Sequence, residues 1–245
     1  MSTTSKVAFI TGGNRGLGLE TARGLGKLGI TVIIGARDLA KGDAAVQALK
    51  QEGIVAAAVI FDALTPSTHQ DVYKVLERKY GKLDILVNNA GVSLTPFFGN
   101  NSSTVSQEIL KQTFDVNFFS VVALTQVLLP LIKKAPAGRI VNLSSILGSL
   151  GVHQMPDSPI AVAKELAYNA SKTALNAFTV HLAEELKDTS VKVNSAHPGW
   201  VKTDMGGAEA PMEISEGGKT SVQLATLPAD GPTGGFFHLG EALPW

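Results

Sequence analysis

The feature that most constrains the fold is a glycine-rich turn from Gly12 to Gly18, set between an apolar run and a helical pattern. Before the turn, residues 7–10 are apolar and partly β-branched, which predicts a short buried strand. After it, apolar residues from Leu17 to Leu28 recur at helical spacing. Such a turn directs unpaired backbone N–H groups and the positive end of the helix dipole at one spot. It therefore predicts an anion-binding site, where glycine lets the backbone approach a phosphate.

The glycine spacing narrows the choice of ligand. A kinase-type phosphate loop would place Lys-Ser/Thr after its last glycine, but Leu19 follows Gly18. The six-residue dinucleotide fingerprint also fails to fit, because the pattern reads Thr-Gly-x-x-x-Gly-x-Gly. A strand–helix turn without a ligand is the structural alternative. The turn residues that we expect against a bound cofactor are Gly12, Asn14, Arg15, Gly16, Leu17 and Gly18.

Composition bounds the class of protein. The 245 residues, 44% hydrophobic and 17% charged, suit a single α/β domain over residues 1–245. A formal net charge of zero gives no support for a nucleic-acid or anionic-membrane partner. The absence of cysteine excludes disulfides and thiol catalysis. The first strand begins within a few residues and no apolar run approaches ~20 residues, so we expect an unprocessed cytoplasmic protein without a membrane span.

Short apolar runs alternate with helical patterns along the chain. Strands are expected at residues 7–10, 31–36, 54–61, 83–87, 139–143, 191–194 and 234–237. Helices are expected near 17–28 and 44–49 and at 67–80, 104–134, 166–186 and 215–227, with loops at 93–103 and 148–163. Nearly continuous apolar strands indicate a parallel sheet with helices on both faces. Right-handed crossovers then predict a doubly wound, Rossmann-type fold whose ligand crevice lies at the carboxyl ends of the strands.

Tyr168 and Lys172 lie one helical turn apart on the helix expected at 166–186. The other tyrosines, Tyr73 and Tyr80, have an acidic residue at the same offset. An ammonium ~4 Å from a phenolate, at an effective dielectric near 20, stabilises the anion by about 4 kcal/mol. That interaction would move the pKa of the phenol from about 10 towards about 7. The pair therefore suits proton donation to a carbonyl oxygen, although a surface contact is the structural alternative.

Two further polar residues fall where chemistry is expected. Ser145 follows a buried strand, so it shares a sheet edge with the glycine turn and could donate a hydrogen bond to a developing oxyanion. Asn117 lies in an unusually apolar helical stretch, where an amide is costly unless it is hydrogen-bonded. A helix bend or a buried capping amide is the structural alternative for Asn117.

These residues together resemble the short-chain dehydrogenase/reductase family over essentially the whole chain. The matching motifs are Thr11–Gly18, Asn88-Asn89-Ala90-Gly91, Asn117, Ser145, Tyr168-x-x-x-Lys172 and Pro198-Gly199. The likeness is greatest to NADPH-dependent carbonyl reductases, through residues 36–38, 117–119 and 198–205.

The resemblance implies a role for each of four catalytic residues. Tyr168 would be the proton donor, and Lys172 would lower its pKa while holding the nicotinamide ribose. Ser145 would orient the substrate carbonyl, and Asn117 would hold a water that relays protons through Lys172.

The resemblance also implies further cofactor contacts. Asp62 would contact the adenine, and Thr203 would bind near the nicotinamide carboxamide or the phosphates. The remaining cofactor contacts implied are Asn89, Ala90, Gly91, Pro198, Gly199 and Val201, besides Tyr168 and Lys172 themselves.

Charge predicts which cofactor is used. An NAD enzyme of this fold places a carboxylate at the end of the second strand, where this chain has Ala36 followed by Arg37. Arg15 supplies a second guanidinium from the glycine turn, and two planar forks suit a 2′-phosphate. Asp38 is the counter-argument, since a small register shift would make it a ribose ligand. We therefore predict NADPH/NADP as the cofactor.

The substrate is predicted only as a class. Ser145 and Tyr168 are 23 positions apart, longer than in most of the family, and the added residues form a loop over the active-site mouth. With Leu94, Trp200 and Met205 in the pocket wall, a ketone or aldehyde with hydrophobic groups is expected. Monomeric carbonyl reductases carry a longer insertion at this point, so both a monomer and a homo-oligomer are left open.

Two kinds of protein are the alternatives to a carbonyl reductase. A 3-ketoacyl, sugar or steroid dehydrogenase would use the same fold, because fold does not fix substrate. A non-catalytic NADP(H)-sensing protein would bind the cofactor without turnover, but it would be free to lose Tyr168 or Lys172. The five histidines share no metal-ligand spacing, so no metal site is predicted.

Overall fold

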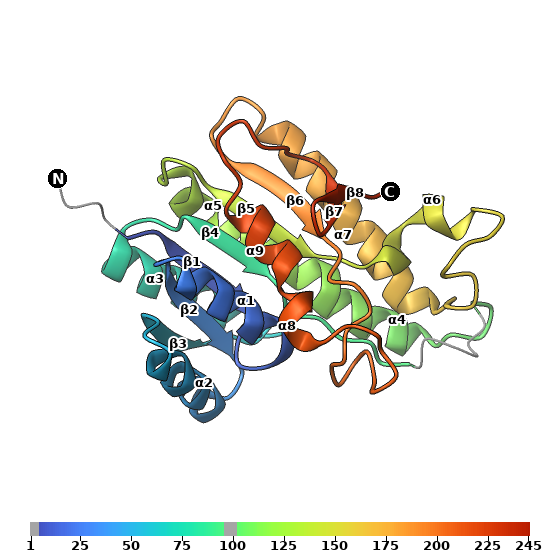
Figure 1. Ribbon diagram of the computed structural model, residues 1–245, viewed down its shortest axis with the longest axis horizontal. Coiled ribbons are helices and arrows are strands. Elements are labelled where there is room, and N and C mark those ends of the chain that lie inside the picture. The colour runs from blue at the N-terminus through green and yellow to red at the C-terminus, as the bar shows by residue number, and fades with distance from the viewer. Residues whose placement is uncertain (1–4, 96–101) are drawn as a thin grey trace.

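The computed structural model describes residues 5–95 and 102–245, and within them the centre of the molecule is an eight-stranded sheet (Figure 1). Its order is β3-β2-β1-β4-β5-β6-β7-β8, parallel except for the antiparallel β7–β8 pair. The strands are β1 (Val7–Thr11), β2 (Thr31–Ala36), β3 (Ala56–Ile60), β4 (Ile85–Asn88), β5 (Arg139–Leu143), β6 (Lys192–Ala196), β7 (Phe236–His238) and β8 (Glu241–Ala242).

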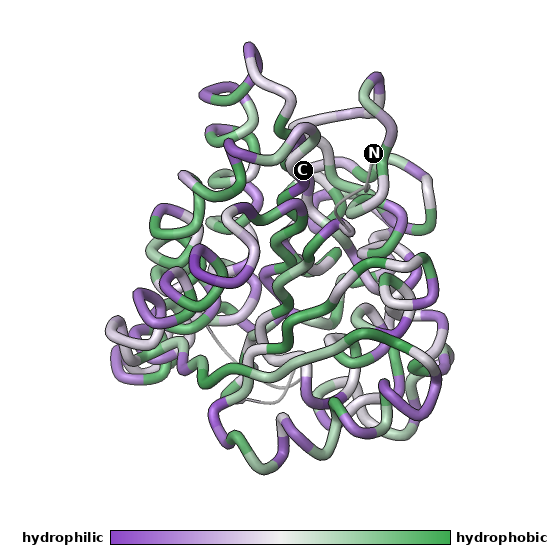
Figure 2. Tube along the Cα trace, turned by 90° about the vertical axis from the view of Figure 1, so that its left-hand side faces the viewer, coloured by the Kyte–Doolittle hydropathy of each residue, from purple (hydrophilic) through white to green (hydrophobic). Residues whose placement is uncertain are grey.

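Helices cover both faces of this sheet (Figure 1). They are α1 (Gly16–Lys27), α2 (Leu39–Gln51), α3 (Pro66–Tyr80), α4 (Gln107–Phe114), α5 (Ser120–Lys133), α6 (Leu150–His153), α7 (Leu166–Glu185), α8 (Ile214–Gly217) and α9 (Lys219–Ala225). One apolar core packs α1, α2 and α9 against the sheet, through side chains such as Leu25, Leu49 and Leu224. The other packs α3, α5 and α7, through side chains such as Leu76 and Leu128. In Figure 2 the trace at the centre of the molecule is largely hydrophobic, while hydrophobic and hydrophilic positions alternate in the surrounding helices.

This architecture confirms the doubly wound α/β fold. The strand order reverses at β1, which pairs with β2 on one side and β4 on the other. At such a point two connections leave the sheet in opposite directions, so a crevice opens at the carboxyl ends of the strands. The fold thus places the glycine turn after β1 beside the ends of β4 and β5.

The expected helix at 104–134 is broken in the middle. A five-residue π-helix, Asp115–Phe119, separates α4 from α5, and Asn117 lies within it. A π-turn inserts an extra residue into the helical ladder and often marks a functional site. The helix is therefore distorted at Asn117, the residue for which a helix bend is the structural alternative.

The combined helical stretch Gln107–Lys133 is long and apolar enough to cross a membrane by length and composition alone, contrary to the expectation from single apolar runs. Within the molecule, its buried side chains Leu124, Leu128, Leu131 and Ile132 pack on the sheet. That packing accounts for the apolar face as the core of a sheet-covering helix.

Three smaller expectations are corrected. The final strand is a hairpin, because β8 pairs antiparallel with β7. The helix expected at 215–227 is two short helices, α8 and α9, and the loop expected at 148–163 contains the short helix α6. Gly217 allows α8 to pack closely against α1, because a Cβ at this position would lie 2.4 Å from the Leu17 side chain. Periodicity does not report such short elements, which depend on tertiary contacts.

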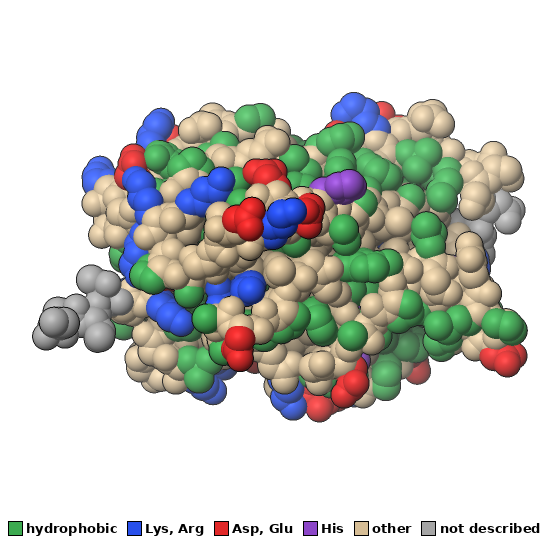
Figure 3. Space-filling view, turned by 90° about the horizontal axis from the view of Figure 1, so that it is seen from above, with side chains coloured by type: hydrophobic (Ala, Val, Ile, Leu, Met, Phe, Trp, Pro, Cys, Tyr) green, Lys and Arg blue, Asp and Glu red, His purple; other side chains and the backbone are tan. Residues whose placement is uncertain are grey.

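The surface mixes charges of both signs. On the face in Figure 3, acidic and basic side chains stand next to one another among apolar ones, without a field of one sign. Exposed ion pairs such as Lys187–Glu184 contribute to this mixture.

Candidate active site

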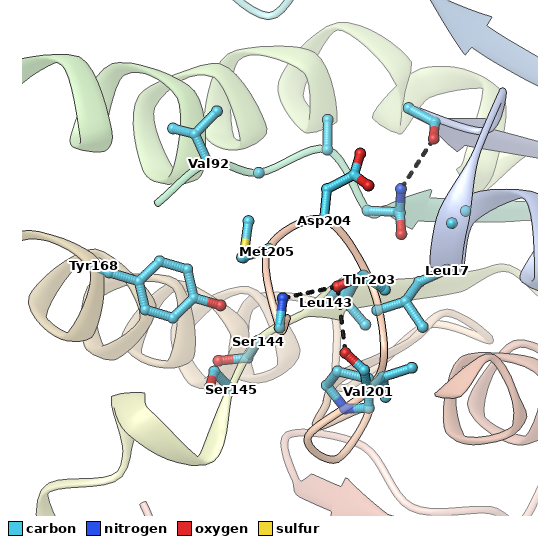
Figure 4. Close-up of a pocket in the computed structure, with 18 of the residues that line it drawn as sticks. Leu17, Val92, Leu143, Ser144, Ser145, Tyr168, Val201, Thr203, Asp204 and Met205 are labelled. Atoms are coloured by element: carbon cyan, nitrogen blue, oxygen red, sulfur yellow. Dashed lines mark hydrogen bonds between the residues drawn. The ribbon is translucent and has the colours of Figure 1, made fainter. Parts of the chain in front are cut away.

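A cavity of about 1120 Å³ opens at the carboxyl ends of the parallel strands. Its walls come from the glycine turn, from the residues that follow β2 to β6, and from the segments 159–163 and 198–208. Figure 4 shows side chains from several of these elements converging on it. Because six separate connections meet here, the cavity lies where the strand order predicts a ligand.

The glycines of the turn are required for two reasons: some adopt a positive φ, and one lies too close to neighbouring atoms for a side chain. Gly12 and Gly16 have φ of +63° and +54°, a region that side chains other than glycine rarely adopt. A Cβ on Gly18 would lie 2.5 Å from the Gly12 carbonyl oxygen and from Asn89 Nδ2. These glycines therefore bring the backbone to the cavity wall where a larger residue would block it.

Hydrogen bonds hold the turn against the end of β4. Thr11 Oγ1 accepts from the backbone N–H groups of Asn89 and Ala90, both at 2.9 Å. Asn89 Nδ2 in turn donates to the Thr11 carbonyl oxygen at 2.7 Å. The expected contacts Asn89 and Ala90 thus lie in the cavity wall and also fix the geometry of the glycine turn.

The start of α1 is open to an anion. Arg15 is the N-cap residue, and its side chain makes no capping hydrogen bond. The first N–H groups of the helix are therefore left for another acceptor, with the helix dipole favouring negative charge. Arg15 and Arg37 both line the cavity and are exposed, and Arg15 Nη1 is 2.5 Å from Asp204 Oδ2 across its mouth.

The acidic residues near the second and third strands have separate places. Asp38 caps α2, accepting from the N–H groups of Ala40 and Lys41, and it does not line the cavity. Asp62 does line the cavity, and its carboxylate accepts from the Leu64 N–H at 3.1 Å. Asp38, the carboxylate that could have favoured NAD by binding the ribose, therefore caps a helix and does not line the cavity.

Helix α7 carries the tyrosine–lysine pair on its cavity face. Tyr168 and Lys172 are buried, with 7% and 4% of their surfaces exposed, and both line the cavity. Lys172 Nζ lies 5.6 Å from the centre of the Tyr168 ring and donates to the Leu143 carbonyl oxygen at 2.7 Å. The Tyr168 hydroxyl is hydrogen-bonded to Ser145, and in Figure 4 it points toward Ser145 and into the cavity.

The pKa of Tyr168 shifts opposite to the expected direction. Burial raises the pKa of Tyr168 to about 12; the Ser145 hydrogen bond opposes this rise, while the negative charge of Glu165 adds to it. Burial also lowers the pKa of Lys172 to about 8. The expectation of a phenol near 7 is therefore wrong for the chain alone. Desolvation, which a sequence estimate at fixed dielectric leaves out, is the largest cause of this shift.

Ser145 stands at the end of β5 on a tight turn. Its Oγ accepts from the Leu147 N–H at 3.2 Å, within a 3₁₀ turn formed by Ile146–Gly148. A Cβ on Gly148 would lie 2.8 Å from the Lys172 backbone, so this turn packs directly on α7. The strand end and the helix are thereby fixed to each other, which keeps Ser145 beside Tyr168.

Asn117 lies behind the cavity wall. It is fully buried and does not line the cavity. Its amide holds the Val92 backbone from both sides, accepting from the N–H and donating to the carbonyl oxygen, each at 2.8 Å. It also donates to Ser171 Oγ on α7 at 3.0 Å. A Cβ on Gly91 would lie 3.3 Å from Asn117 Oδ1 and 3.5 Å from Lys172 Nζ, so these three residues meet at one point.

The segment after β6 forms a hydrogen-bonded loop over the cavity. Trp200 Nε1 donates to the Gly206 carbonyl oxygen at 2.8 Å, and the Gly206 N–H donates to Thr203 Oγ1 at 3.0 Å. Gly199 begins the loop with φ of +90°. The expected contacts in this loop that line the cavity are Pro198, Gly199, Val201 and Thr203.

The other end of the cavity is apolar. Pro159, Ile160 and Val162 line it from the segment before α7, together with Trp200 and Met205. The described residue Leu94, which we expected in this wall, does not line the cavity. Sequence reasoning also missed Val92, Ile146 and Leu147, which line it. Their position directly after the ends of β4 and β5 is the signal that would have found them.

The histidines form no metal site. Within residues 5–95 and 102–245, no group of three or more His, Cys, Asp or Glu side chains is arranged to hold a metal ion. His197 lines the cavity, and burial lowers its pKa to about 3, so it is neutral at physiological pH. Its Nδ1 accepts from the Ile146 N–H, which makes it a support for the turn after Ser145.

Comparison with known proteins agrees with this geometry. Residues 6–214 match the family model described as short chain dehydrogenase. Carbonyl reductase (NADPH) 1 of Pongo abelii is 34% identical over 293 residues, covering all of both chains. Salutaridine reductase of Papaver bracteatum is 30% identical and covers 98% of this chain and 96% of its own.

Solved structures give the same result. The NADPH-bound carbonyl reductase from chicken fatty liver superposes with a TM-score of 0.84 at 27% identity, covering 98% of this chain and 99% of its own. The carbonyl reductase Sniffer of D. melanogaster gives 0.82 at 28% identity, covering 99% of this chain and all of its own. From the glycine turn, the tyrosine–lysine helix and these matches together, the chain belongs to the short-chain dehydrogenase family.

Proposed function

We propose that this protein is an NADPH-dependent carbonyl reductase that reduces ketones or aldehydes bearing hydrophobic groups. The observation that carries the proposal is that Tyr168, Ser145 and Lys172 meet in the same cavity as the glycine turn. This places a proton donor and an anion-binding backbone at two ends of one crevice.

The residues present fit NADPH. Gly18 leaves the backbone exposed where a Cβ would fill the cradle. Arg15 and Arg37 stand at the cavity wall, and guanidinium groups bind phosphate through paired hydrogen bonds. Asp38 is committed to capping α2, so it does not compete for this role. Relatives that are named for NADPH, or were solved with NADPH or NADP, agree with this choice.

The chain's own residues would handle the proton. NADPH, when bound, supplies a hydride for the carbonyl carbon. Tyr168 then gives its phenolic proton to the carbonyl oxygen, so the C=O bond becomes a C–H and an O–H bond. Ser145 hydrogen-bonds the same oxygen and Tyr168. Lys172 stabilises the phenolate until a proton from solvent restores the acid.

The apolar wall supports the substrate class. The segment 159–163 carries no charged side chain, and Trp200 and Met205 also line the cavity. A charged group or several hydroxyl groups on the substrate would lose their hydration there without a partner. A neutral, hydrophobic carbonyl compound is therefore favoured over a sugar.

The test is an NADPH-oxidation screen with hydrophobic ketones, aldehydes, acyl thioesters and sugars, run in parallel with NADPH binding. Turnover with hydrophobic ketones or aldehydes supports the proposal. Turnover confined to acyl thioesters or sugars would make the protein a different dehydrogenase of the same family. Tight NADPH binding without any turnover would make it a cofactor sensor.

A further inference from the structure

Glu165 is a buried carboxylate that the proposed reaction does not use. It directly precedes α7, has 1% of its surface exposed, and does not line the cavity. Three donors surround it: Thr95 Oγ1 at 2.6 Å, the Ala167 N–H at 3.1 Å and the Tyr168 N–H at 2.5 Å. A buried charge is tolerated when donors satisfy it in this way, and the N-terminal end of the α7 dipole adds to that stabilisation.

The contacts of Glu165 join two walls of the active site. One carboxylate oxygen takes the backbone N–H of Tyr168 itself, so the first turn of α7 is fixed at the residue that carries the phenol. The other oxygen accepts a hydrogen bond from Thr95, the last residue of the segment 92–95. The first residue of this segment, Val92, is hydrogen-bonded to Asn117 through its backbone N–H and carbonyl oxygen. The segment 92–95 is therefore fastened at both ends, and Val92 lines the cavity.

Glu165 also acts on the phenol through its charge. The groups that face Tyr168 are Lys172, with Nζ 5.6 Å from the ring centre, the Ser145 hydroxyl, and Glu165. His197, elsewhere in the cavity wall, is neutral at physiological pH. The negative charge of Glu165 raises the pKa of Tyr168, in the same direction as burial and against any effect of the Lys172 ammonium.

We propose that Glu165 is a positioning residue for Tyr168: its buried carboxylate fixes the first turn of α7 to the segment 92–95 and so holds the phenol in place beside Ser145. This inference rests on the proposed function, in which Tyr168 is the proton donor. The charge of Glu165 adds to the burial that keeps the phenol protonated, which is the form that gives a proton to a carbonyl oxygen. Lys172 then acts as the opposing charge once the proton has left.

The first experiment measures the charge effect without turnover. The chain has three tyrosines, so labelling with [ζ-¹³C]tyrosine gives few resonances, and Tyr168→Phe assigns the one that matters. The NADP⁺-bound protein is titrated from about pH 9 to about pH 12.5, as wild type and as Glu165→Gln, because burial raises the Tyr168 pKa to about 12. Glutamine keeps the size and an acceptor oxygen but removes the charge. We expect the Tyr168 pKa to fall by about 1 unit in Glu165→Gln. An unchanged Tyr168 titration would overturn the electrostatic role.

The second experiment measures the tie to the segment 92–95. Thr95→Val removes the hydroxyl and keeps the carboxylate, so the Tyr168 titration should stay in place while KM for the carbonyl substrate rises several-fold. Ser106→Ala is the matched control, because Ser106 caps α4 and does not line the cavity. Thr95→Val kinetics identical to Ser106→Ala would contradict the tie.

The two proposals fail separately. If Tyr168→Phe keeps its turnover, the proposed catalysis is wrong whatever Glu165 does to the phenol. If Tyr168→Phe is inactive but Glu165→Gln leaves both the Tyr168 titration and the pH dependence of kcat/KM unmoved, only the role of Glu165 is lost.

Discussion

The two ends of the cavity are built by different means. At the end formed by the glycine turn, the shape of the cavity depends on backbone conformation. Gly12 has a positive φ and Gly18 leaves no room for a Cβ, and hydrogen bonds between Thr11 and Asn89 hold the turn in place. At the end formed by α7, buried side chains from four segments meet, and their protonation depends on burial. A binding surface can thus be specified by a few local residues, whereas a proton donor needs the whole fold around it.

The charges differ in the same way. Arg15 and Asp204 form an exposed pair at the cavity mouth, where solvent screens the interaction. Lys172 and Tyr168 are buried, and burial lowers the pKa of Lys172 and raises the pKa of Tyr168. Both shifts favour the neutral form of the side chain. Charge at the mouth can therefore select a ligand at little cost to folding, while charge in the interior is linked to stability.

After removal of the Tyr168 hydroxyl itself, the largest effect is expected from a variant that changes only the end of the cavity formed by α7. Lys172→Met keeps the volume and removes the amine that stabilises the phenolate, so kcat should fall by about 10³-fold with NADPH affinity changed far less. Steady-state kinetics and a fluorescence titration with NADPH measure the two quantities. A kcat within about tenfold of wild type would show that the lysine is not needed for proton transfer.

The converse variant changes only the end of the cavity formed by the glycine turn. Gly18→Val places a side chain where a Cβ already lies 2.5 Å from the Gly12 carbonyl oxygen. We expect NADPH affinity to fall by about 100-fold or more, with circular dichroism showing that the fold is retained. Unchanged affinity in a folded Gly18→Val protein would place the cofactor elsewhere.

Cofactor preference tests the role of the exposed charges at the end of the cavity formed by the glycine turn. Arg37→Asp removes a guanidinium from the wall and adds a carboxylate, so the ratio of kcat/KM for NADPH over NADH should fall by about 10- to 100-fold. Asp38→Asn, a change at the neighbouring helix cap, should leave the ratio unchanged. Loss of preference in Asp38→Asn but not in Arg37→Asp would reverse the assignment.

The smallest expected effect concerns stability and pH. Burial lowers the pKa of Lys172 from 10.5 to about 8, so below about pH 8 the folded protein carries a penalty of about 3 kcal/mol. Between pH 8 and 10.5 the unfolded chain binds this proton and the folded chain does not, so the penalty disappears as pH rises.

Lys172→Met should therefore unfold at a higher temperature than wild type at pH 7. The gain is partly offset because the Leu143 carbonyl oxygen loses its donor, which leaves a net effect of about 1 kcal/mol. Above about pH 10 the difference should reverse. Thermal unfolding across this pH range measures it, and a constant difference between the two proteins would contradict the buried-charge account.

The same contrast explains what the sequence could predict. The glycine turn, the strand ends and the offset of Tyr168 and Lys172 are local patterns, and they located the fold and the cavity residues. The direction of the Tyr168 pKa was wrong, because desolvation depends on segments far apart in the chain. The contact between Glu165 and Thr95 was also missed, since the two residues lie 70 positions apart in the chain.

Asn117 and Leu94 show the limit for individual side chains. The apolar context of Asn117 indicated a buried amide, but only the π-turn reveals that it holds Val92 from behind the wall. Leu94 is near the cavity in sequence, yet Val92, two residues before it, is the residue that lines the cavity. In an irregular segment no periodicity fixes which side chain points inward.

The most direct test of the account is the Tyr168→Phe variant, assayed for carbonyl reduction and for NADPH binding on the same sample. Phenylalanine keeps the packing of the ring and removes only the hydroxyl that Ser145 contacts. The account predicts that kcat falls by about 10³-fold or more while the NADPH dissociation constant changes by less than about threefold. Near-normal turnover in this variant would contradict the assignment of Tyr168 as the proton donor.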